Sequence, residues 1–281
     1  ESTTDDVDAA VAAAKQADVT IVVAATTSGE ASDRADLNLD NGANRLIREV
    51  ARHASKTVVL AQVPGAVVMP WRDQVSSILT LFLGGQETGA AWANIVFGDE
   101  APAGRLPIMM PASEADTIAP ATLDNLRIEY SEGMKTSYRS PTFQAAFPFG
   151  HGLTYSTFEY LAPEAAPCKG ALCLRLKVRN SGAVAARAVP QLYLEFPPEA
   201  EHPRSLLKGF QKTGLIAPGD SADVEFRLSD RDLSYYSVAT GAWVKAGQVT
   251  AQIGESSADI RQLYTMPTHR DLRSSESPLF P

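Results

Sequence analysis

The spacing of apolar residues changes near residue 170, and this change predicts two different folds along the chain. Before it, the apolar runs "DVTIVVAAT", "KTVVLAQV" and "VSSILTLFL" alternate with segments whose apolar residues recur at helical spacing. After it, every second residue is apolar, as in "LCLRLKVRN", "ADVEFRL" and "QVTAQIG". A period near 3.6 indicates helices, and a period of two indicates strands with one buried face.

The first part alternates strand and helix signals with short links between them. Its strands are apolar and β-branched, which is typical of parallel strands covered on both faces. "ANRLIREVARHA" places Leu46, Ile47 and Val50 on one helical stripe, and "QETGAAWANIVFG" predicts a helix that ends at Gly98. We therefore expect a three-layer α/β/α sandwich with a mostly parallel sheet over residues 1–140.

The second part is predicted to be all β. Short alternating strands separated by turns such as "NSGA" and "APGD" favour a β-sandwich of the immunoglobulin or fibronectin type. We expect a connecting segment over 141–165, the sandwich over 166–265 and a tail over 266–281. Trp243, with the adjacent Tyr235 and Tyr236, is expected to pack in the sandwich.

The composition, with 44% hydrophobic and 21% charged residues, is that of a globular protein. The net charge of −8 argues against a nucleic-acid or anionic-membrane partner, because either would select a basic patch. No apolar run is long enough to predict a membrane span. The four histidines are scattered at positions 53, 151, 202 and 269, so no metal site is predicted, and no cofactor is implied.

Two further motifs have competing interpretations. Cys168 and Cys173 in "CKGALC" are either free thiols or a local disulfide that closes a small loop. "GGQETGAA" has glycines at the spacing of a phosphate loop, but Ala90 and Ala91 stand where that loop needs Lys and Ser/Thr. We interpret its glycines as a tight turn between a strand and a helix.

The strongest candidate for chemistry is Glu30, in the polar loop "TTSGEASDR" that follows the first apolar strand. In open α/β sheets, functional groups gather beyond the carboxyl ends of strands. A carboxyl group there can donate a proton to a leaving oxygen. Ser28 and Gly29 precede it, and Asp33 and Arg34 follow closely enough to position it.

Several long motifs resemble, in order, the C-terminal half of glycoside hydrolase family 3, the β-glucosidase family. "SGEASDRADLNL" resembles the acid/base loop, and "GGQETGAAWANIVFGDEAPAGRLPIMMP" resembles the block that follows it. "FPFGHGLTYSTFEY" resembles the connecting segment, and "LKGFQKTGLIAPGDSADVEFRLSDRDLSYYS" resembles the fibronectin type III-like domain. The resemblance extends from about Asp5 to Leu263.

The resemblance implies a retaining exo-acting β-glucosidase in which Glu30 is the general acid/base. Ser28, Gly29, Asp33 and Arg34 would bind substrate or position the loop. The catalytic partner of Glu30 would be an aspartate on an N-terminal (β/α)8 barrel of the same precursor, since no acidic residue of this chain matches the nucleophile motif. A retaining glycosidase needs two carboxyl groups about 5 Å apart.

The chain departs from the family pattern in three places. Ala31 and Ser32 stand where many fungal members have an aromatic residue that helps form the leaving-sugar site. The barrel, which needs about 250 residues, is expected to lie on another chain, because the residues here are already assigned to the other two domains. The first strand and helix of the α/β domain are also expected to be missing, which would leave a bare sheet edge and apolar surface for a partner to cover.

Two alternatives remain open from the sequence. The chain could be a structural or assembly component on a family 3 scaffold that has lost catalysis. It could also be part of a β-xylosidase-like exo-glycosidase, because the barrel chooses the sugar. The acidic start "ESTTDDVDAA" is not a secretory signal. The extracellular or secretory location that the resemblance implies would need a signal on the precursor.

Overall fold

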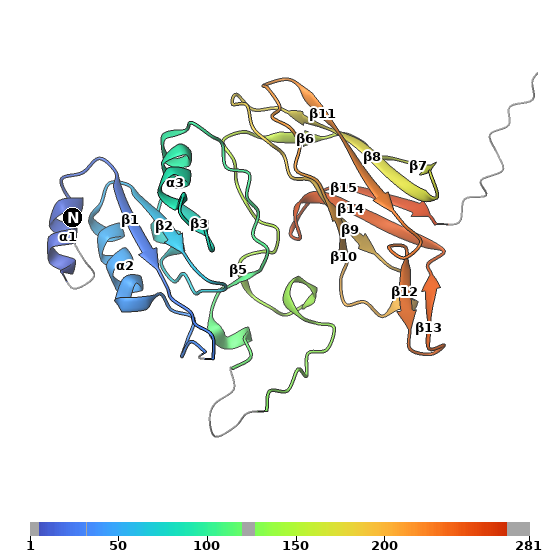
Figure 1. The fold of residues 1–281 in the computed structure, drawn as a ribbon, viewed down its shortest axis with the longest axis horizontal. Helices are drawn as coiled ribbons and strands as arrows, with labels where there is room; N and C mark the ends of the chain where they lie inside the picture. The colour runs from blue at the N-terminus through green and yellow to red at the C-terminus, as the bar shows by residue number, and fades with distance from the viewer. Residues whose placement is uncertain (1–5, 32, 120–126, 269–281) are drawn as a thin grey trace, which may run out of the picture. The chain divides into compact units, whose positions relative to one another are not determined.

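The computed structural model describes residues 6–31, 33–119 and 127–268. Ser32 of the candidate loop and residues 269–281 of the predicted tail lie outside these ranges. The described residues form two compact units, and Figure 1 labels their α-helices and most of their strands. Of the described residues, the first unit comprises 6–31, 33–99, 108–119, 127–131 and 142–147, and the second comprises 100–107, 132–141 and 148–268.

The first unit contains a parallel sheet of three strands in the order β1-β2-β3 (Figure 1). Helix α2 packs against β1 and β2, and α1 packs against α2. The stripe Leu46, Ile47 and Val50 is the buried side of α2, which confirms the helical interpretation of that segment. The elements are α1 Val7–Ala14, β1 Thr20–Ala25, η1 Asp40–Gly42, α2 Ala43–His53, β2 Thr57–Gln62, η2 Arg72–Gln74, β3 Ser77–Leu81, α3 Thr88–Phe97, β4 Met110–Pro111, η3 Glu114–Asp116 and β5 Ala145–Phe147.

The glycines between β3 and α3 form a tight turn, as the sequence predicts. A Cβ added at Gly84 would lie 2.4 Å from the Leu81 side chain and 2.5 Å from that of Thr88. Gly85 has a φ of +71°, a conformation that favours glycine. Helix α3 then ends at Gly98, which adopts the left-handed conformation of a helix C-cap.

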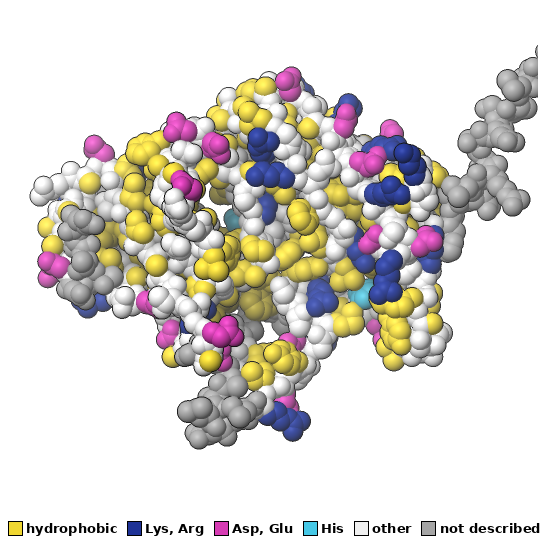
Figure 2. Space-filling model, viewed as in Figure 1, with side chains coloured by type: hydrophobic (Ala, Val, Ile, Leu, Met, Phe, Trp, Pro, Cys, Tyr) yellow, Lys and Arg dark blue, Asp and Glu magenta, His cyan; other side chains and the backbone are white. Residues whose placement is uncertain are grey.

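Much apolar surface of the first unit is exposed. On β1, Val22 and Ala24 are buried, but Ile21 and Val23 are 46% and 62% exposed. Helix α3 is rich in apolar residues and has no buried residue, and Phe97 is 79% exposed. Figure 2 shows hydrophobic side chains at the visible surface of this unit. The sequence predicts β1 to be covered on both faces, whereas the described residues cover only one.

The second unit is an antiparallel β-sandwich, so the predicted fold class is confirmed for both parts. One sheet has the order β10-β9-β14-β15, and the other has β11-β8-β6 with β7 also paired to β8. Strand β6 lies within the predicted connecting segment, whose boundaries stay predictions. The elements are η4 Ser137–Arg139, β6 Phe158–Tyr160, β7 Glu164–Cys168, β8 Ala171–Asn180, β9 Gln191–Glu195, η5 Pro198–Ala200, β10 Leu206–Phe210, β11 Ser221–Leu228, β12 Ser234–Ser237, β13 Ala242–Lys245, β14 Gln248–Ser256 and β15 Asp259–Pro267.

The strand alternation separates the core of the sandwich from its charged surface. Alternate residues of β8, from Leu172 to Val178, are buried against the apolar positions of β9, β11 and β14. On the outer side, Arg175 pairs with Glu225 at 2.5 Å and Lys177 with Asp223 at 3.1 Å. Exposed pairs of this kind contribute little stability, so burial of the inner face is the dominant stabilising term.

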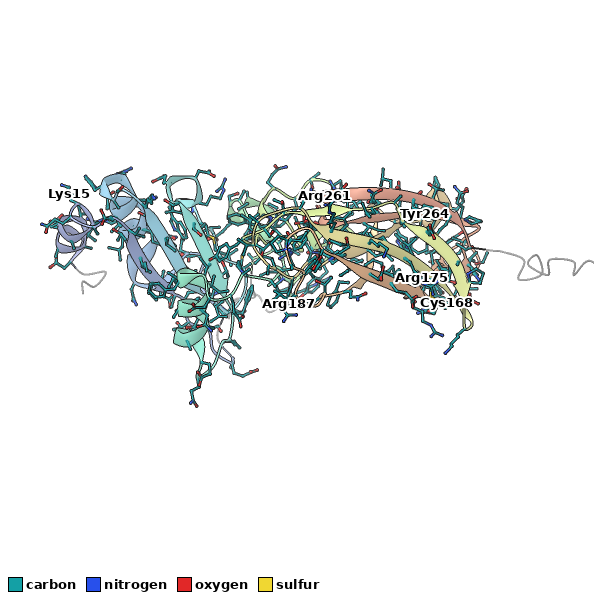
Figure 3. The ribbon with its side chains drawn as sticks, turned by 90° about the horizontal axis from the view of Figure 1, so that it is seen from above. Lys15, Cys168, Arg175, Arg187, Arg261 and Tyr264 are labelled. Carbon is teal, nitrogen blue, oxygen red and sulfur yellow. A yellow bond between two sulfur atoms is a disulfide. The ribbon has the colours of Figure 1, made fainter. Side chains whose placement is uncertain are left out.

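The two cysteines form a disulfide. Cys168 is the last residue of β7 and Cys173 lies in the adjacent β8, with their Cα atoms 5.8 Å apart. Cys168 is labelled in Figure 3. The structure therefore decides between the two sequence interpretations in favour of the local bridge.

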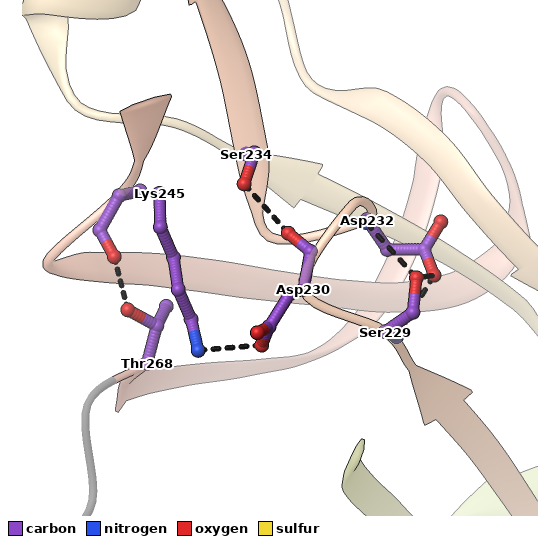
Figure 4. Close-up of polar contacts among 7 residues, drawn as sticks. Ser229, Asp230, Asp232, Ser234, Lys245 and Thr268 are labelled. Carbon is purple, nitrogen blue, oxygen red and sulfur yellow. Dashed lines mark hydrogen bonds and ion pairs between the residues drawn. The ribbon is translucent and has the colours of Figure 1, made fainter. Parts of the chain in front are cut away.

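Trp243 and Tyr236, which the sequence predicts to pack in the sandwich, instead lie at the surface of the β12–β13 hairpin. Tyr235 is buried as expected, but Tyr236 and Trp243 are about half exposed and face each other edge to face. The hairpin is tied at its base, where Lys245 Nζ lies 2.6 Å from Asp230 (Figure 4). Tyr236 and Trp243 are cross-strand partners on the hairpin and share its outer face, whereas Tyr235 points to the opposite, buried face.

Asn180 ends β8 as a fully hydrogen-bonded buried amide. Its Nδ2 donates to the carbonyl oxygens of Val184 and Ile216, both at 2.8 Å. Its Oδ1 accepts from Ser156 Oγ at 2.6 Å and from the Gly182 amide at 3.0 Å. One side chain thus connects three loops. Only an amide can supply both the two donated and the two accepted hydrogen bonds.

Replacing Asn180 with Asp should destabilise the second unit by about 3 kcal/mol at pH 7, because a buried carboxylate would face two carbonyl oxygens. This repulsion raises the pKa of the introduced carboxyl group. The loss should therefore shrink as the pH falls toward about 4, the ordinary value for Asp. Calorimetric unfolding at both pH values measures this, with exposed Asn94→Asp as a control. Equal losses at the two pH values would contradict the account.

Candidate active site

The loop that carries Glu30 begins where β1 ends. The Thr26 amide donates to the Gln62 carbonyl at 3.1 Å and so extends the β1–β2 pairing by one residue. The chain then leaves the sheet and returns at Asp40, the first residue of η1. Because β1, β2 and β3 are parallel, this loop lies at their carboxyl edge, where the sequence places the chemistry.

The two ends of the loop are joined by the carboxylate of Asp40. Thr26 Oγ1 donates to Asp40 Oδ1 at 2.5 Å. The Thr27 amide and Thr27 Oγ1 donate to Asp40 Oδ2 at 2.7 and 2.8 Å. The hydrogen bond from Thr26, followed by those from Thr27, lowers the pKa of Asp40, because all three donors favour the charged carboxylate. We call this set of contacts the Asp40 clamp.

Other contacts hold the middle of the loop. Arg34 Nη2 donates to the Ala66 carbonyl at 2.6 Å, and the Leu37 amide donates to Glu114 Oε1 at 2.8 Å. The Leu37 carbonyl in turn accepts from the Val68 amide at 2.9 Å. The loop is therefore attached to the rest of the unit at Arg34 and Leu37 as well as at its two ends.

A buried hydrogen-bond chain supports the far end of the loop. Trp71 is fully buried, and its Nε1 donates to Asn44 Oδ1 at 2.7 Å. Asn44 Nδ2 donates to Asn38 Oδ1 at 2.9 Å. Trp71 is thus a core residue, and its hydrogen bond to Asn44 of α2 reaches the loop through Asn38.

The loop surrounds a hollow of about 500 Å³. The structure brings four of the five predicted site residues to its wall, namely Ser28, Gly29, Asp33 and Arg34. The other lining residues are Thr27, Ala35, Asp36, Asn38 and Asp40. Glu30 is exposed in the turn beside this wall and does not line the hollow.

Two local features affect how Glu30 is presented. Ala31 has a φ of +61°, the left-handed conformation that costs a residue with a Cβ about 1–2 kcal/mol. A Cβ added at Gly29 would meet nothing within 4 Å, so contacts within the described chain do not require glycine there. The carboxyl group of Glu30 is therefore presented to the outside by a turn with a strained backbone.

Asp40, Thr26 and Thr27 were missed as site residues by the sequence analysis. Asp40 precedes the helical stripe of α2, so it has the sequence context of an ordinary helix cap. Its two partners lie 13 and 14 residues away, a separation with no local periodicity. Only the return of the loop to the sheet brings these residues together.

The described residues contain no group of three or more His, Cys, Asp or Glu side chains placed to hold a metal ion. Among these residues, no helix is long and apolar enough to cross a membrane. The wall of the hollow itself offers carboxyl, guanidinium, hydroxyl and amide groups.

The parallel α/β unit and the antiparallel sandwich each match a known domain family. Residues 2–155 match the Glycosyl hydrolase family 3 C-terminal domain, and residues 188–257 match the Fibronectin type III-like domain. This chain belongs to glycoside hydrolase family 3.

Its relatives include β-glucosidases of bacteria and fungi. The thermostable β-glucosidase B of Acetivibrio thermocellus is 34% identical over 88% of this chain and 35% of its own length. The probable β-glucosidase L of Aspergillus terreus is 32% identical over 92% of this chain and 40% of its own length. The chain therefore spans between a third and two fifths of these two relatives.

Solved structures share the fold. DesR, a β-glucosidase from Streptomyces venezuelae in complex with D-glucose, has a TM-score of 0.86 and 31% identity, over 94% of this chain and 35% of its own. The β-D-glucoside glucohydrolase of Trichoderma reesei has a TM-score of 0.84 and 28% identity, over 94% and 42%. These matches support both the α/β and the sandwich architecture.

Replacing Ala31 with Gly should stabilise the first unit by up to about 1 kcal/mol. Relief of the left-handed strain exceeds the extra chain entropy that glycine adds to the unfolded state. Ala35→Gly is the matched control, because it lies in the same loop and has no positive φ. Urea unfolding measures both variants, and a gain for Ala35→Gly as large as that for Ala31→Gly would argue against backbone strain.

Replacing Asp40 with Asn should open the Asp40 clamp, because an amide has one acceptor oxygen for three donors. We expect the Thr27 amide to lose protection against hydrogen exchange by at least about fivefold, equivalent to one net hydrogen bond. Asp36→Asn is the control, since its Oδ1 can still accept from the Asn38 amide. The clamp is complete above pH 3.8 and is lost as the pH falls through the lowered pKa of Asp40.

The matching pH test compares protection of Thr27 in the unmodified chain and in Asp40→Asn. The difference between them should be constant near neutral pH and should shrink below pH 3.8. A difference that persists at the lowest pH would mean that the variant acts through packing rather than through the carboxylate charge.

Proposed function

We propose that this chain is the C-terminal portion of a retaining, exo-acting β-glucosidase that hydrolyses terminal β-D-glucosyl residues. The observation that carries the proposal is the exposed carboxyl group of Glu30, on a loop that the Asp40 clamp and Arg34 attach to the carboxyl edge of the sheet. Glu30 would be the general acid/base, and the nucleophilic aspartate would come from a (β/α)8 barrel outside these residues.

The chemistry would proceed in two steps. In the first, the barrel's aspartate attacks the anomeric carbon as the glycosidic bond breaks, Glu30 protonates the glycosidic oxygen, the leaving group departs as an alcohol, and a covalent glycosyl intermediate remains. In the second, the Glu30 carboxylate removes a proton from water, which attacks the intermediate and releases glucose. The two carboxyl groups need a separation of about 5 Å, so the loop must hold Glu30 at a defined depth.

The hollow beside Glu30 would receive the leaving group. Arg34 Nη1 is buried and has no hydrogen-bond partner among the described residues, so a sugar hydroxyl can accept from it. Ser28 supplies a hydroxyl, and Gly29 leaves room for close approach of a ligand. Asp33 completes the polar wall. The small Ala31 offers no aromatic stacking surface, which predicts weak discrimination among leaving groups.

Two observations support the proposal that a partner protein covers the exposed apolar surface of the first unit. Strand β1 pairs only with β2 among the described strands, and its Ile21 and Val23 are exposed. A helix as apolar as α3 is normally buried. A barrel-containing partner from the same precursor would cover such surfaces. The Cys168–Cys173 disulfide favours an oxidising, extracellular or secretory location for the assembly.

Glu30→Gln tests the proposal in the assembly that this chain forms with its copurifying barrel. Turnover of a β-glucoside with a poor leaving group should fall by about a hundredfold or more, and turnover of an activated aryl β-glucoside should fall much less. The difference arises because an activated leaving group needs little proton donation. Glu159→Gln, an exposed residue of β6, should leave both rates unchanged.

Other results would select the alternatives. Faster turnover of aryl β-xylosides than of β-glucosides would identify a β-xylosidase-like exo-glycosidase. A partner that lacks the nucleophilic aspartate, together with no turnover of any glycoside, would favour a structural component on a family 3 scaffold. Equal losses for good and poor leaving groups would reject Glu30 as the proton donor.

A further inference from the structure

A second hollow lies within the fibronectin type III-like unit and is independent of the Glu30 loop. It has a volume of about 450 Å³, within the range of small-molecule sites. Its walls come from the end of β9, the loop around η5 up to the residue before β10, strand β14 with the turn that follows it, and η4. The lining residues are Tyr138, Tyr193, Glu195, Phe196, Pro197, Pro198, His202, Pro203, Arg204, Ser205, Gln252 and Ser257.

We propose that this hollow binds a neutral sugar, a pyranoside of one or two units, through the Tyr138 ring together with Glu195, Arg204 and Gln252. The site would be separate from the catalytic loop and would hold a glucoside chain or product on the second unit. Binding of the sugar to this hollow would require neither the barrel nor Glu30.

The Tyr138 ring, the aromatic wall of the hollow, is held in place by contacts with residues of the same unit. The Tyr138 ring stacks on Phe149 with 4.6 Å between ring centroids and meets Tyr193 edge-on at 5.9 Å. Its hydroxyl accepts from the Leu207 amide at 3.0 Å. Ser137 just before it has a φ of +50°, a strain of the kind that collects at ligand clamps. A rigid aromatic face suits the apolar C–H face of a sugar ring.

The polar groups of the wall suit hydroxyls. Gln252 Nε2 donates to Glu195 Oε2 at 3.0 Å, so the amide and the carboxylate hold each other in place while Glu195 Oε1 remains available. Arg204 is exposed and makes no hydrogen bond or ion pair with another described residue. A carboxylate that accepts and a guanidinium that donates can engage neighbouring hydroxyls of one ring.

The charges of the wall favour a neutral ligand. Glu195 and Arg204 balance each other, and the pKa of His202 is lowered, first by burial and then by Lys208 and Arg139. A neutral imidazole adds no charge to the wall. His202 Nδ1 is buried without a hydrogen-bond partner among the described residues, a group that a ligand or its water can satisfy.

The exposed Trp243 is a poorer candidate for a sugar platform. The guanidinium carbon of Arg231 lies 3.2 Å from the centre of its ring and so covers one face, and Tyr236 meets the ring edge-on. This contrast makes Trp243 a useful control, because it is an aromatic of the same unit outside the hollow.

The test titrates the isotope-labelled chain with cellobiose and follows backbone amide signals by NMR. We expect saturable shifts at Ser205, Gln252 and Ser257. Arg204→Ala and Glu195→Gln should each weaken binding at least about fivefold, equivalent to loss of one net hydrogen bond. Matched controls are Lys212→Ala and Glu199→Gln, both exposed and outside the hollow, which should leave the affinity unchanged.

Four outcomes would overturn the proposal. They are no saturable shifts, shifts confined to the first unit, loss of binding on Trp243→Ala with none on Arg204→Ala, or tighter binding of a proline-rich peptide than of cellobiose at these residues. The last would assign the hollow to peptide recognition through its aromatic and proline walls. None of these readouts depends on glycosidase activity, so failure of the catalytic proposal is a separate result.

Discussion

Parallel pairing of β1, β2 and β3 is the constraint on which the position of the candidate site depends. Parallel strands need crossover connections, so their carboxyl ends meet at one edge and the loops that follow them gather there. The loop of Glu30 leaves β1 at that edge and returns to it at Asp40. A change that shifted the pairing by one residue would turn the buried Val22 and Ala24 outward and move this loop away from its supports.

The loop combines firm attachment with local strain. Its ends are joined through the Asp40 carboxylate, and Arg34 attaches its middle to the Ala66 carbonyl. Between these contacts, Ala31 adopts a left-handed backbone that most residues avoid. An acid that must meet a second carboxyl at about 5 Å benefits from such a support, because small displacements weaken proton transfer.

The two units differ in how completely they bury their apolar residues. The sandwich has a continuous core between its two sheets, and Asn180 satisfies its polar atoms where three loops meet. The α/β unit leaves Ile21, Val23 and Phe97 exposed. Exposed apolar side chains that lie close together usually mark an interaction surface.

The sequence by itself determined the fold class, because apolar periods of 3.6 and of two specify which faces of helices and strands can be buried. It also predicted the polar loop after the first strand, since a polar segment between a buried strand and a helical stripe indicates a connection. It left the state of Cys168 and Cys173 open and missed the role of Asp40. Only the tertiary structure decided these points, together with the exposure of Trp243 and the hollow around Tyr138. Their contacts join residues distant in sequence or on different elements, and local periodicity carries no information about such pairs.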